Sequence, residues 1–239
     1  MNFNIGFEIE FCSHRSITRR KIKEDLELLG FSFKGNIKEK FQIVDDLSIE
    51  AAYPLVGHEI ITPPRPYSES MKILEILFGY LETINASTNE STGFHTNISF
   101  KDSQDNRKFN ILNFLFSIPE DIGNSFGRMN NKFCKPITNI FRFNNRFYVH
   151  KEPSLSTKKK MVLGRMFEIM SKYHYCNIGH WKNKKYLEFR YMGNTDYHLR
   201  FLDIQTEIKN LCLLMNNSIE NDEHVETIIN KFKFECVDK

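Results

Sequence analysis

Apolar and polar residues alternate over the first eleven positions of the chain. A period of two is typical of a β-strand that buries one face and leaves the other polar. The two sets fall on opposite parities, with Phe3, Ile5, Phe7, Ile9 and Phe11 on one and Asn4, Gly6, Glu8 and Glu10 on the other. This pattern predicts a half-buried strand at the start of the sequence.

Other short segments have the composition or the alternation of strands. We predict strands over Phe31–Phe33, Phe41–Val44, Glu59–Thr62, Thr92–Phe100 and Tyr186–Met192. Pro63-Pro64 ends the third of these, because proline cannot donate a hydrogen bond to a neighbouring strand. The stretch Ile137–Tyr148 is also β-rich, and Asn144-Asn145 within it suits a hairpin turn.

Between these segments the apolar residues recur with the period of a helix. The predicted helices are Ser16–Leu29, Ser68–Ile84, Phe109–Ser117, Thr157–Tyr173, Asp196–Ile219 and Asp222–Phe232, and Pro119–Phe126 is predicted to be irregular. Ser16 or Thr18 can cap the first helix, and Gly30 suits its C-terminal end. Strands and helices do not alternate regularly. The order therefore favours one α+β domain over residues 1–239, a largely antiparallel sheet with helices on one face, and C-terminal helices over about 196–233.

Composition narrows the class of protein. The chain has 239 residues, 41% of them hydrophobic, and its 33 Lys and Arg against 30 Asp and Glu leave a net charge of +3. Because cationic and anionic residues are nearly equal in number, the composition does not indicate a nucleic-acid or membrane-surface partner. The five cysteines are scattered and form no C-x-x-C pair. No signal peptide is evident, and no apolar run approaches the roughly 20 residues of a membrane span. We expect a reducing, cytoplasmic setting.

The polar faces of the predicted strands hold the candidate chemistry. Glu8 and Glu10 project from one face about 7 Å apart, the i, i+2 spacing of an extended chain. His95, Asn97 and Ser99 lie opposite the apolar residues of their strand, Glu188 and Arg190 share a face of theirs, and Glu59 begins another. If these strands are neighbours, one sheet face presents four glutamates, a histidine and an arginine.

Clustered carboxylates repel one another unless a cation neutralises them. Carboxylates with a single imidazole suit Mg²⁺ or Mn²⁺ better than Zn²⁺. Each signal also has a structural interpretation. An E-x-E strand is most often a solvated face, and a lone histidine such as His95 is more often a hydrogen-bonded residue than a ligand. On the structural interpretation, Glu188 and Arg190 are surface residues that pair across strands.

In order along the chain, these segments resemble the amidoligases of the glutamine synthetase and glutamate–cysteine ligase superfamily, which are ATP-dependent carboxylate–amine ligases. Five ordered elements support the resemblance: Gly6-Phe7-Glu8-Ile9-Glu10; Asp46-Leu47-Ser48 with Glu59-Ile60-Ile61-Thr62-Pro63; Gly93-Phe94-His95-Thr96-Asn97; Arg128-Met129-Asn130-Asn131-Lys132-Phe133-Cys134; and Glu188-Phe189-Arg190, leading to Gly193-Asn194-Thr195-Asp196. The family pattern has glycine where Leu47 stands. Asp45 beside Asp46 leaves the choice of carboxylate open, and Asn97 replaces a histidine found in some members.

The resemblance implies a curved antiparallel sheet that forms a funnel, as in the glutamine synthetase catalytic domain, with ATP and Mg²⁺ (or Mn²⁺) as cofactors. It implies that Glu8, His95 and Glu188 hold one ion, and that Glu10, Glu59 and Asp46 hold a second nearer the acceptor carboxylate. Arg128 and Arg190 become the catalytic and nucleotide-binding candidates, although an isolated Arg128 is also what a surface loop shows. Asn97 is a further cofactor-binding candidate, since it can hydrogen bond but is a poorer metal ligand.

The implied reaction joins a carboxylate of an amino acid, peptide or related molecule to an amine through an acyl phosphate. The first alternative is a non-catalytic amidoligase-like binding or structural subunit, and the second is a metal-dependent hydrolase, which no H-E-x-x-H or Cys/His cluster supports. A glutamine amidotransferase is a candidate partner. The sequence leaves open the two substrates and the oligomeric state, although superfamily members often form homo-oligomers. The abundance of Asn, Ile, Lys and Phe is typical of an AT-rich bacterial, phage or viral genome.

Overall fold

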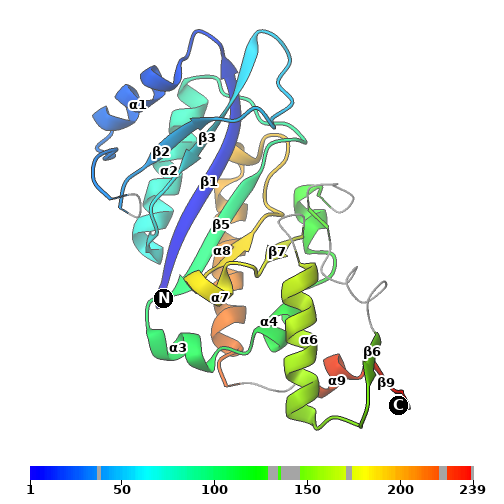
Figure 1. Ribbon diagram of the computed structural model, residues 1–239. Helices are drawn as coiled ribbons and strands as arrows, with labels where there is room; N and C mark the ends of the chain where they lie inside the picture. Colours follow the sequence, from blue (N-terminus) through cyan, green and yellow to red (C-terminus); the bar gives the residue numbers. More distant parts are fainter. Residues whose placement is uncertain (37–38, 129–133, 136–145, 171–173, 221–224, 238–239) are drawn as a thin grey trace.

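The computed structural model describes residues 1–36, 39–128, 134–135, 146–170, 174–220 and 225–237 (Figure 1). Its main sheet has seven strands in the order β2-β3-β1-β5-β8-β7, and β4 pairs with β1. The strands are β1 (Phe3–His14), β2 (Gln42–Asp45), β3 (Leu55–Ile61), β4 (Arg65–Pro66), β5 (Phe94–Phe100), β7 (Cys176–Asn177) and β8 (Leu187–Phe189). Every pairing in this sheet is antiparallel. The predicted α+β class is therefore confirmed.

The rest of the described chain contains helices and 3₁₀ turns. They are α1 (Arg19–Leu28), α2 (Tyr67–Thr83), α3 (Ser103–Lys108), α4 (Ile111–Ser117), α6 (Leu155–Ile169), α7 (Trp181–Lys184), α8 (Phe201–Asn217) and α9 (Val225–Ile229), with 3₁₀ turns η1 (Ile122–Phe126) and η2 (Tyr197–Leu199). Among the described residues, no helix combines the length and the apolar character needed to cross a bilayer.

Helices cover one face of the main sheet and leave its other face for polar groups. In Figure 1, α2 and α8 lie side by side behind the strands, and α2 contacts both β1 and α8. The apolar parity of the first strand points to this side: the ring of Phe7 is 5.5 Å from that of Phe94, which in turn is 5.7 Å from that of Phe78 on α2. Burial of these aromatic rings fixes the register, because a slip of one residue would place the glutamates in the core.

Local sequence signals explain where the first helix begins. The side chain of Thr18 accepts a hydrogen bond from the backbone N–H of Lys21, so Thr18 rather than Ser16 is the N-cap. Ile22 and Leu26 form the buried face, and Gly30 follows the helix at a positive φ of 90°. The fold thus matches the predicted helix to within a few residues at each end.

A second, two-stranded sheet lies near the C-terminus. It pairs β6 (Arg146–Val149) in parallel with β9 (Lys233–Cys236), and the rings of Phe147 and Phe234 stack 5.0 Å apart. This pairing joins segments nearly 90 residues apart, and the strand over Lys233–Cys236 was not predicted from the sequence.

Several predicted elements differ from the structure. Phe31–Phe33 is not a strand: Phe31 and Phe33 instead pack their rings against Phe41, with the centroids of Phe31 and Phe41 4.6 Å apart. The alternating phenylalanines of this segment are thus explained by ring packing and not by strand pairing. The third predicted strand starts earlier, at Leu55, and the segment Ser103–Lys108 is helical although no helix was predicted.

The last predicted strand and helices are shorter than expected. The strand is Leu187–Phe189, and the long C-terminal helix starts at Phe201 after a 3₁₀ turn. The final helix ends at Ile229 and not at Phe232, and residues 222–224 of its predicted start lie outside the described residues. Within the β-rich stretch, residues 136–145 lie outside the described residues, and so does the Asn144-Asn145 turn.

Candidate metal centre and active site

Strand register brings the predicted polar residues together on the sheet face opposite α2 and α8. Glu8 lies opposite His95, Glu10 lies opposite Glu59, and Asn97 lies opposite Glu188. Directly opposed residues of antiparallel strands project to the same side. The four central strands β3, β1, β5 and β8 therefore contribute adjacent members of a single polar cluster, as the parity of each strand predicts.

Glu8 is held between two side chains of the neighbouring strand. Its Oε2 lies 3.0 Å from Nδ1 of His95, and its Oε1 accepts a hydrogen bond of 3.0 Å from Nδ2 of Asn97. Burial alone would raise the pKa of Glu8, but the hydrogen bond and the positive charge of His95, with smaller contributions from Asn97 and Arg190, lower it to about 2. Glu8 is thus an ionised ligand candidate over the whole physiological pH range.

Glu188 is 4% exposed and has a set of donors around it. Nδ2 of Asn177 donates to its Oε2 at 2.8 Å, and Arg190 donates to its Oε1. Nε2 of His180 is 3.5 Å from Oε2. Neither Asn177 nor His180 was predicted from the sequence, because Asn177 is on a two-residue strand and His180 precedes a four-residue helix. Such short elements leave no periodic pattern.

Glu10 is fixed by the backbone of the Gly93 turn. Its Oε2 accepts a hydrogen bond of 2.6 Å from the N–H of Gly93, and its Oε1 is 3.7 Å from Nε2 of His95. A Cβ at position 93 would lie 2.4 Å from Nε2 of His95. The glycine in the Gly-x-His motif is therefore required by space, since any side chain would displace the imidazole.

Glu59 is the carboxyl most strongly affected by its acidic neighbours. Burial raises its pKa, and the negative charges of Glu8, Glu10 and Asp46 raise it further, to about 8. A group in this environment holds a proton at neutral pH unless a cation replaces it. The raised pKa of Glu59 indicates that the site holds more carboxylates than its own cationic side chains neutralise.

The structure distinguishes the two neighbouring aspartates. Asp45 lies opposite His58 in the sheet, with its Oδ1 3.2 Å from the imidazole Nδ1, and Asp45 Oδ2 is 3.9 Å from Arg19. The negative charge of Asp46 contributes to the raised pKa of Glu59, whereas neither candidate ligand group includes Asp46. Oδ1 of Asp46 accepts hydrogen bonds from the N–H and Oγ of Ser48, at 2.8 and 2.7 Å.

The leucine that replaces the family glycine fits this turn without strain. Leu47 is 99% exposed and is not among the described residues with a positive φ. Its backbone therefore needs no glycine, and the Asp46–Ser48 hydrogen bonds form with leucine between them.

The two arginines occupy different positions in the site. Arg190 is hydrogen bonded to Glu188, whereas Arg128, at the end of η1, donates from Nη1 to the carbonyl of Thr92 at 3.3 Å. Arg128 is only 2% exposed, burial lowers its pKa, and it has no carboxylate within ion-pair distance among the described residues. The charge of Glu10 only partly offsets this burial. A buried guanidinium without a direct ion pair is costly, and it indicates a place for an anion.

Glycine 193 provides the room for Arg128. A Cβ on Gly193 would lie 2.2 Å from Nη1 of Arg128 and 2.6 Å from the backbone N of Phe94. The glycine that follows the Glu-Phe-Arg strand therefore lets the guanidinium approach the start of β5.

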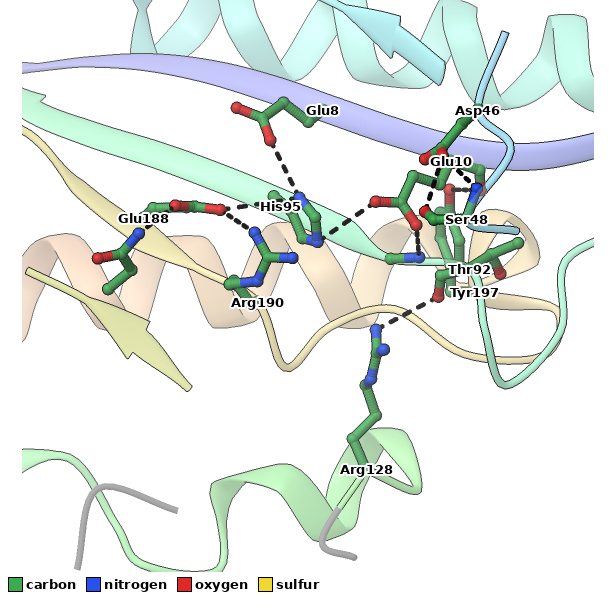
Figure 2. Close-up of polar contacts among 12 residues, drawn as sticks. Glu8, Glu10, Asp46, Ser48, Thr92, His95, Arg128, Glu188, Arg190 and Tyr197 are labelled. Atoms are coloured by element: carbon green, nitrogen blue, oxygen red, sulfur yellow. Dashed lines mark hydrogen bonds and ion pairs between the residues drawn. The ribbon is translucent and has the colours of Figure 1, made fainter. Parts of the chain in front are cut away.

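Two groups of side chains have the spacing of metal ligands. Glu8, His95 and Glu188 form one, and Glu10, Glu59 and His95 form the other, with the ligand atoms of each group within 4.8 Å of one another. His95 belongs to both, and Figure 2 shows Glu8 and Glu10 reaching its two ring nitrogens from different sides. The buried Oδ1 of Asn97 has no hydrogen-bond partner among the described residues, so it offers a further oxygen. This donor set fits a hard divalent cation.

Two cavities lie outside this cluster. One, of about 1030 Å³, lies between α1 and the β2–β3 edge of the sheet and reaches Asp45 and Asp46. Another, of about 670 Å³, is lined by residues of α3, α4, α6 and α7. Neither is lined by the four glutamates.

Together, the fold and the cluster define an α+β protein with a carboxylate-rich candidate metal centre on an antiparallel sheet. The family model described as "putative amidoligase enzyme" matches residues 2–198, which include every residue of the cluster. The chain belongs to this family, whose name indicates a ligase-type enzyme. Among curated proteins, none matches the chain.

Proposed function

We propose that this chain is an ATP-dependent carboxylate–amine ligase that uses Mg²⁺ or Mn²⁺ and works on a glutamine synthetase-like sheet. The observation that supports it most directly is the convergence of Glu8, Glu10, Glu59 and Glu188 around His95. Like charges at this spacing oppose folding unless a bound cation compensates them. Membership of the amidoligase family supports the ligase chemistry.

The residues that would hold the ions follow from the two ligand groups. Glu8, His95 and Glu188 would hold an ion at the nucleotide phosphates, and Glu10, Glu59 and Asp46 an ion nearer the acceptor carboxylate. The geometry adds His95 to the second group, since its Nε2 faces Glu10. Divalent ions supply neutralisation of the phosphate oxygens, which lets one anion approach another.

Arg128 and Arg190 are the proposed anion-binding residues. The buried guanidinium of Arg128 lacks a carboxylate partner among the described residues, and Nε of both arginines is buried without a hydrogen-bond acceptor there. These unused donors are available to the oxygens of a transferring phosphoryl group, which they would stabilise without reorganisation. Asn97 positions Glu8 through its amide nitrogen and offers its amide oxygen to the site.

The reaction follows from these roles. The substrate carboxylate attacks the γ-phosphorus of ATP, the bond to the β-phosphate oxygen breaks, and ADP leaves. An amine then attacks the acyl carbon of the acyl phosphate, loses a proton, and releases inorganic phosphate. The carboxylate is an amino acid, a peptide or a related molecule, and a glutamine amidotransferase that supplies ammonia is a fitting partner.

Coupled release of ADP and phosphate tests the proposal. Purified protein with Mg²⁺ and ATP is expected to release ADP only when a carboxylate pool of amino acids or peptides is present. Glu8→Gln and Glu188→Gln should abolish the release, and Glu75→Gln on the exposed face of α2 should not. Absence of turnover with every pool, together with absence of Mg²⁺-dependent nucleotide binding in calorimetry, would favour the non-catalytic subunit.

A further inference from the structure

The cavity of about 670 Å³ between α3, α4, α6 and α7 has an unusual charge distribution. Five of its lining residues are cationic, namely Arg107, Lys108, Lys159, Lys182 and Lys185. The only carboxylate among the described lining residues is Glu220, and its Oε1 already pairs with Nζ of Lys108 at 2.8 Å. The lining therefore has a larger excess of positive charge than the +3 of the whole chain. Such a concentration of like charge favours an anionic occupant.

Aromatic rings separate these cations. Nζ of Lys182 lies 4.7 Å from the ring centroid of Phe167, and Nζ of Lys185 lies 5.9 Å from that of Trp181. The rings of Trp181 and Phe109 are 4.9 Å apart and form an apolar wall beside the charges. Cations placed over ring faces keep their charge and lose conformational freedom. The cavity thus offers fixed positive charges interspersed with apolar surface.

The cavity is adjacent to the candidate active site along the chain. Trp181 lines the cavity, and the residue before it, His180, reaches the carboxylate cluster with Nε2 3.5 Å from Oε2 of Glu188. The short helix α7 (Figure 1) begins at Trp181, directly after His180. Two successive residues of the chain thus contact the carboxylate cluster and line the cavity, respectively.

We propose that this cavity binds an acidic peptide segment, and, resting on the proposed ligase function, that this segment belongs to the peptide whose carboxylate is activated. Lysine ammonium groups are point charges that pair with scattered carboxylates, and the aromatic wall accepts apolar side chains between them. A nucleic acid would instead need a basic track along its backbone, whereas these cations line a single cavity. The proposal thus assigns a substrate class of acidic peptides.

Trp181 is the only tryptophan of the chain, so its fluorescence reports occupancy of the cavity directly. A hexaglutamate peptide, titrated at low salt without ATP or metal, is expected to change the emission with saturation. The variant Arg107→Glu/Lys182→Glu should weaken binding about tenfold or more, and added salt should weaken binding to the wild-type protein. Both positions are exposed, so reversal leaves the core intact. Lys72→Glu/Lys209→Glu, with the same change in charge on α2 and α8, should bind like wild type.

Equal affinity of the cavity variant and the control variant would overturn the proposal. So would tighter binding of a six-nucleotide single-stranded RNA than of hexaglutamate, because that result assigns the cavity to nucleic acid. Since the titration needs no turnover, its outcome is separate from that of the ligase assay. Peptide binding without any ADP release would support the peptide-binding cavity and overturn the ligase function. Equal rates of ADP release by the cavity variant and the control variant with acidic peptides would support the ligase function and overturn the role of the cavity.

Discussion

Oε2 of Glu8 lies 3.0 Å from Nδ1 of His95 across the β1–β5 pair, and the opposite ring nitrogen of His95 faces Glu10 at 3.7 Å. One imidazole thereby joins the two halves of the carboxylate cluster. Both candidate ligand groups use this residue. The account therefore predicts that the two proposed ions depend on a single side chain.

Replacement of that side chain should remove both ions. His95→Ala is expected to lower Mn²⁺ affinity at least tenfold, since it takes a ligand from each group. Calorimetric titration of Mn²⁺ into metal-free protein measures the change. Ser99→Ala, on the same strand face but outside both ligand groups, is the matched control. Loss of one ion with full retention of the other would contradict the shared role of His95.

Gly93 should tolerate no side chain. Gly93→Ala places a Cβ 2.4 Å from Nε2 of His95, so we expect a loss of about 1–3 kcal/mol in the free energy of unfolding together with weaker metal binding. Gly79→Ala on α2 meets no atom within 4 Å and should stabilise the protein by about 0.5–1 kcal/mol. Urea denaturation of both variants provides the comparison. A neutral Gly93→Ala would show that the imidazole is free to move.

Arg128 should lower stability in the absence of its anion. Arg128→Met removes a buried charge that has no carboxylate partner among the described residues, and Thr92 O keeps a hydrogen bond from the N–H of Asn194. The variant should be as stable as wild type or more stable by about 1–2 kcal/mol, yet lose ligase activity. Thermal denaturation and ADP release measured side by side test this. A strongly destabilised variant would indicate a structural role for the guanidinium.

Glu59 should make the stability of the metal-free protein fall as the pH rises. Its folded-state pKa of about 8 lies above the unfolded value of 4.5, so the folded state binds the extra proton between these limits. The stabilisation is complete below about pH 4.5 and is lost as the pH rises through 8. Glu8 acts outside this window, because its folded-state pKa of about 2 stabilises the protein above 4.5 and is lost as the pH falls through 2.

Urea denaturation in EDTA at pH 5.5 and pH 8.5 measures this difference, and Glu59→Gln isolates the contribution of the carboxyl. Addition of MgCl₂ should abolish the difference, because the cation replaces the proton, and binding of Mg²⁺ at pH 7 should release protons. An identical pH response in wild type and Glu59→Gln would show that Glu59 is not the proton-binding group.

The alternation of side chains along each strand was enough to place much of the candidate cluster on one face of the sheet. Because β-strand side chains alternate, the positions of Glu8, His95 and Glu188 on a common face followed from their own strands once those strands were neighbours. Contacts made by very short elements, or between elements far apart in the sequence, could not be predicted. Asn177 belongs to a strand of two residues, and the β6–β9 pairing joins distant segments, so neither leaves a local pattern.

The choice between the two aspartates also needed the structure. Asp45 and Asp46 are adjacent, so they point to opposite faces of an extended chain, but only the register with β3 shows that Asp45 faces His58. Likewise, the spacing of Phe31 and Phe33 fits both a strand and a packed loop. In the structure this segment is a loop whose rings pack against Phe41.

Oxygen transfer from the substrate carboxylate to phosphate distinguishes ligase chemistry from simple hydrolysis of ATP. The protein would be incubated with ATP, MgCl₂, ammonium and a peptide pool labelled with ¹⁸O in its carboxyl groups, and the released phosphate analysed by mass spectrometry. We expect one ¹⁸O atom in each phosphate released, because the attacking carboxylate oxygen remains on phosphorus when the amine displaces the phosphate group. ADP release with unlabelled phosphate would show that water attacks ATP, and would contradict the ligase.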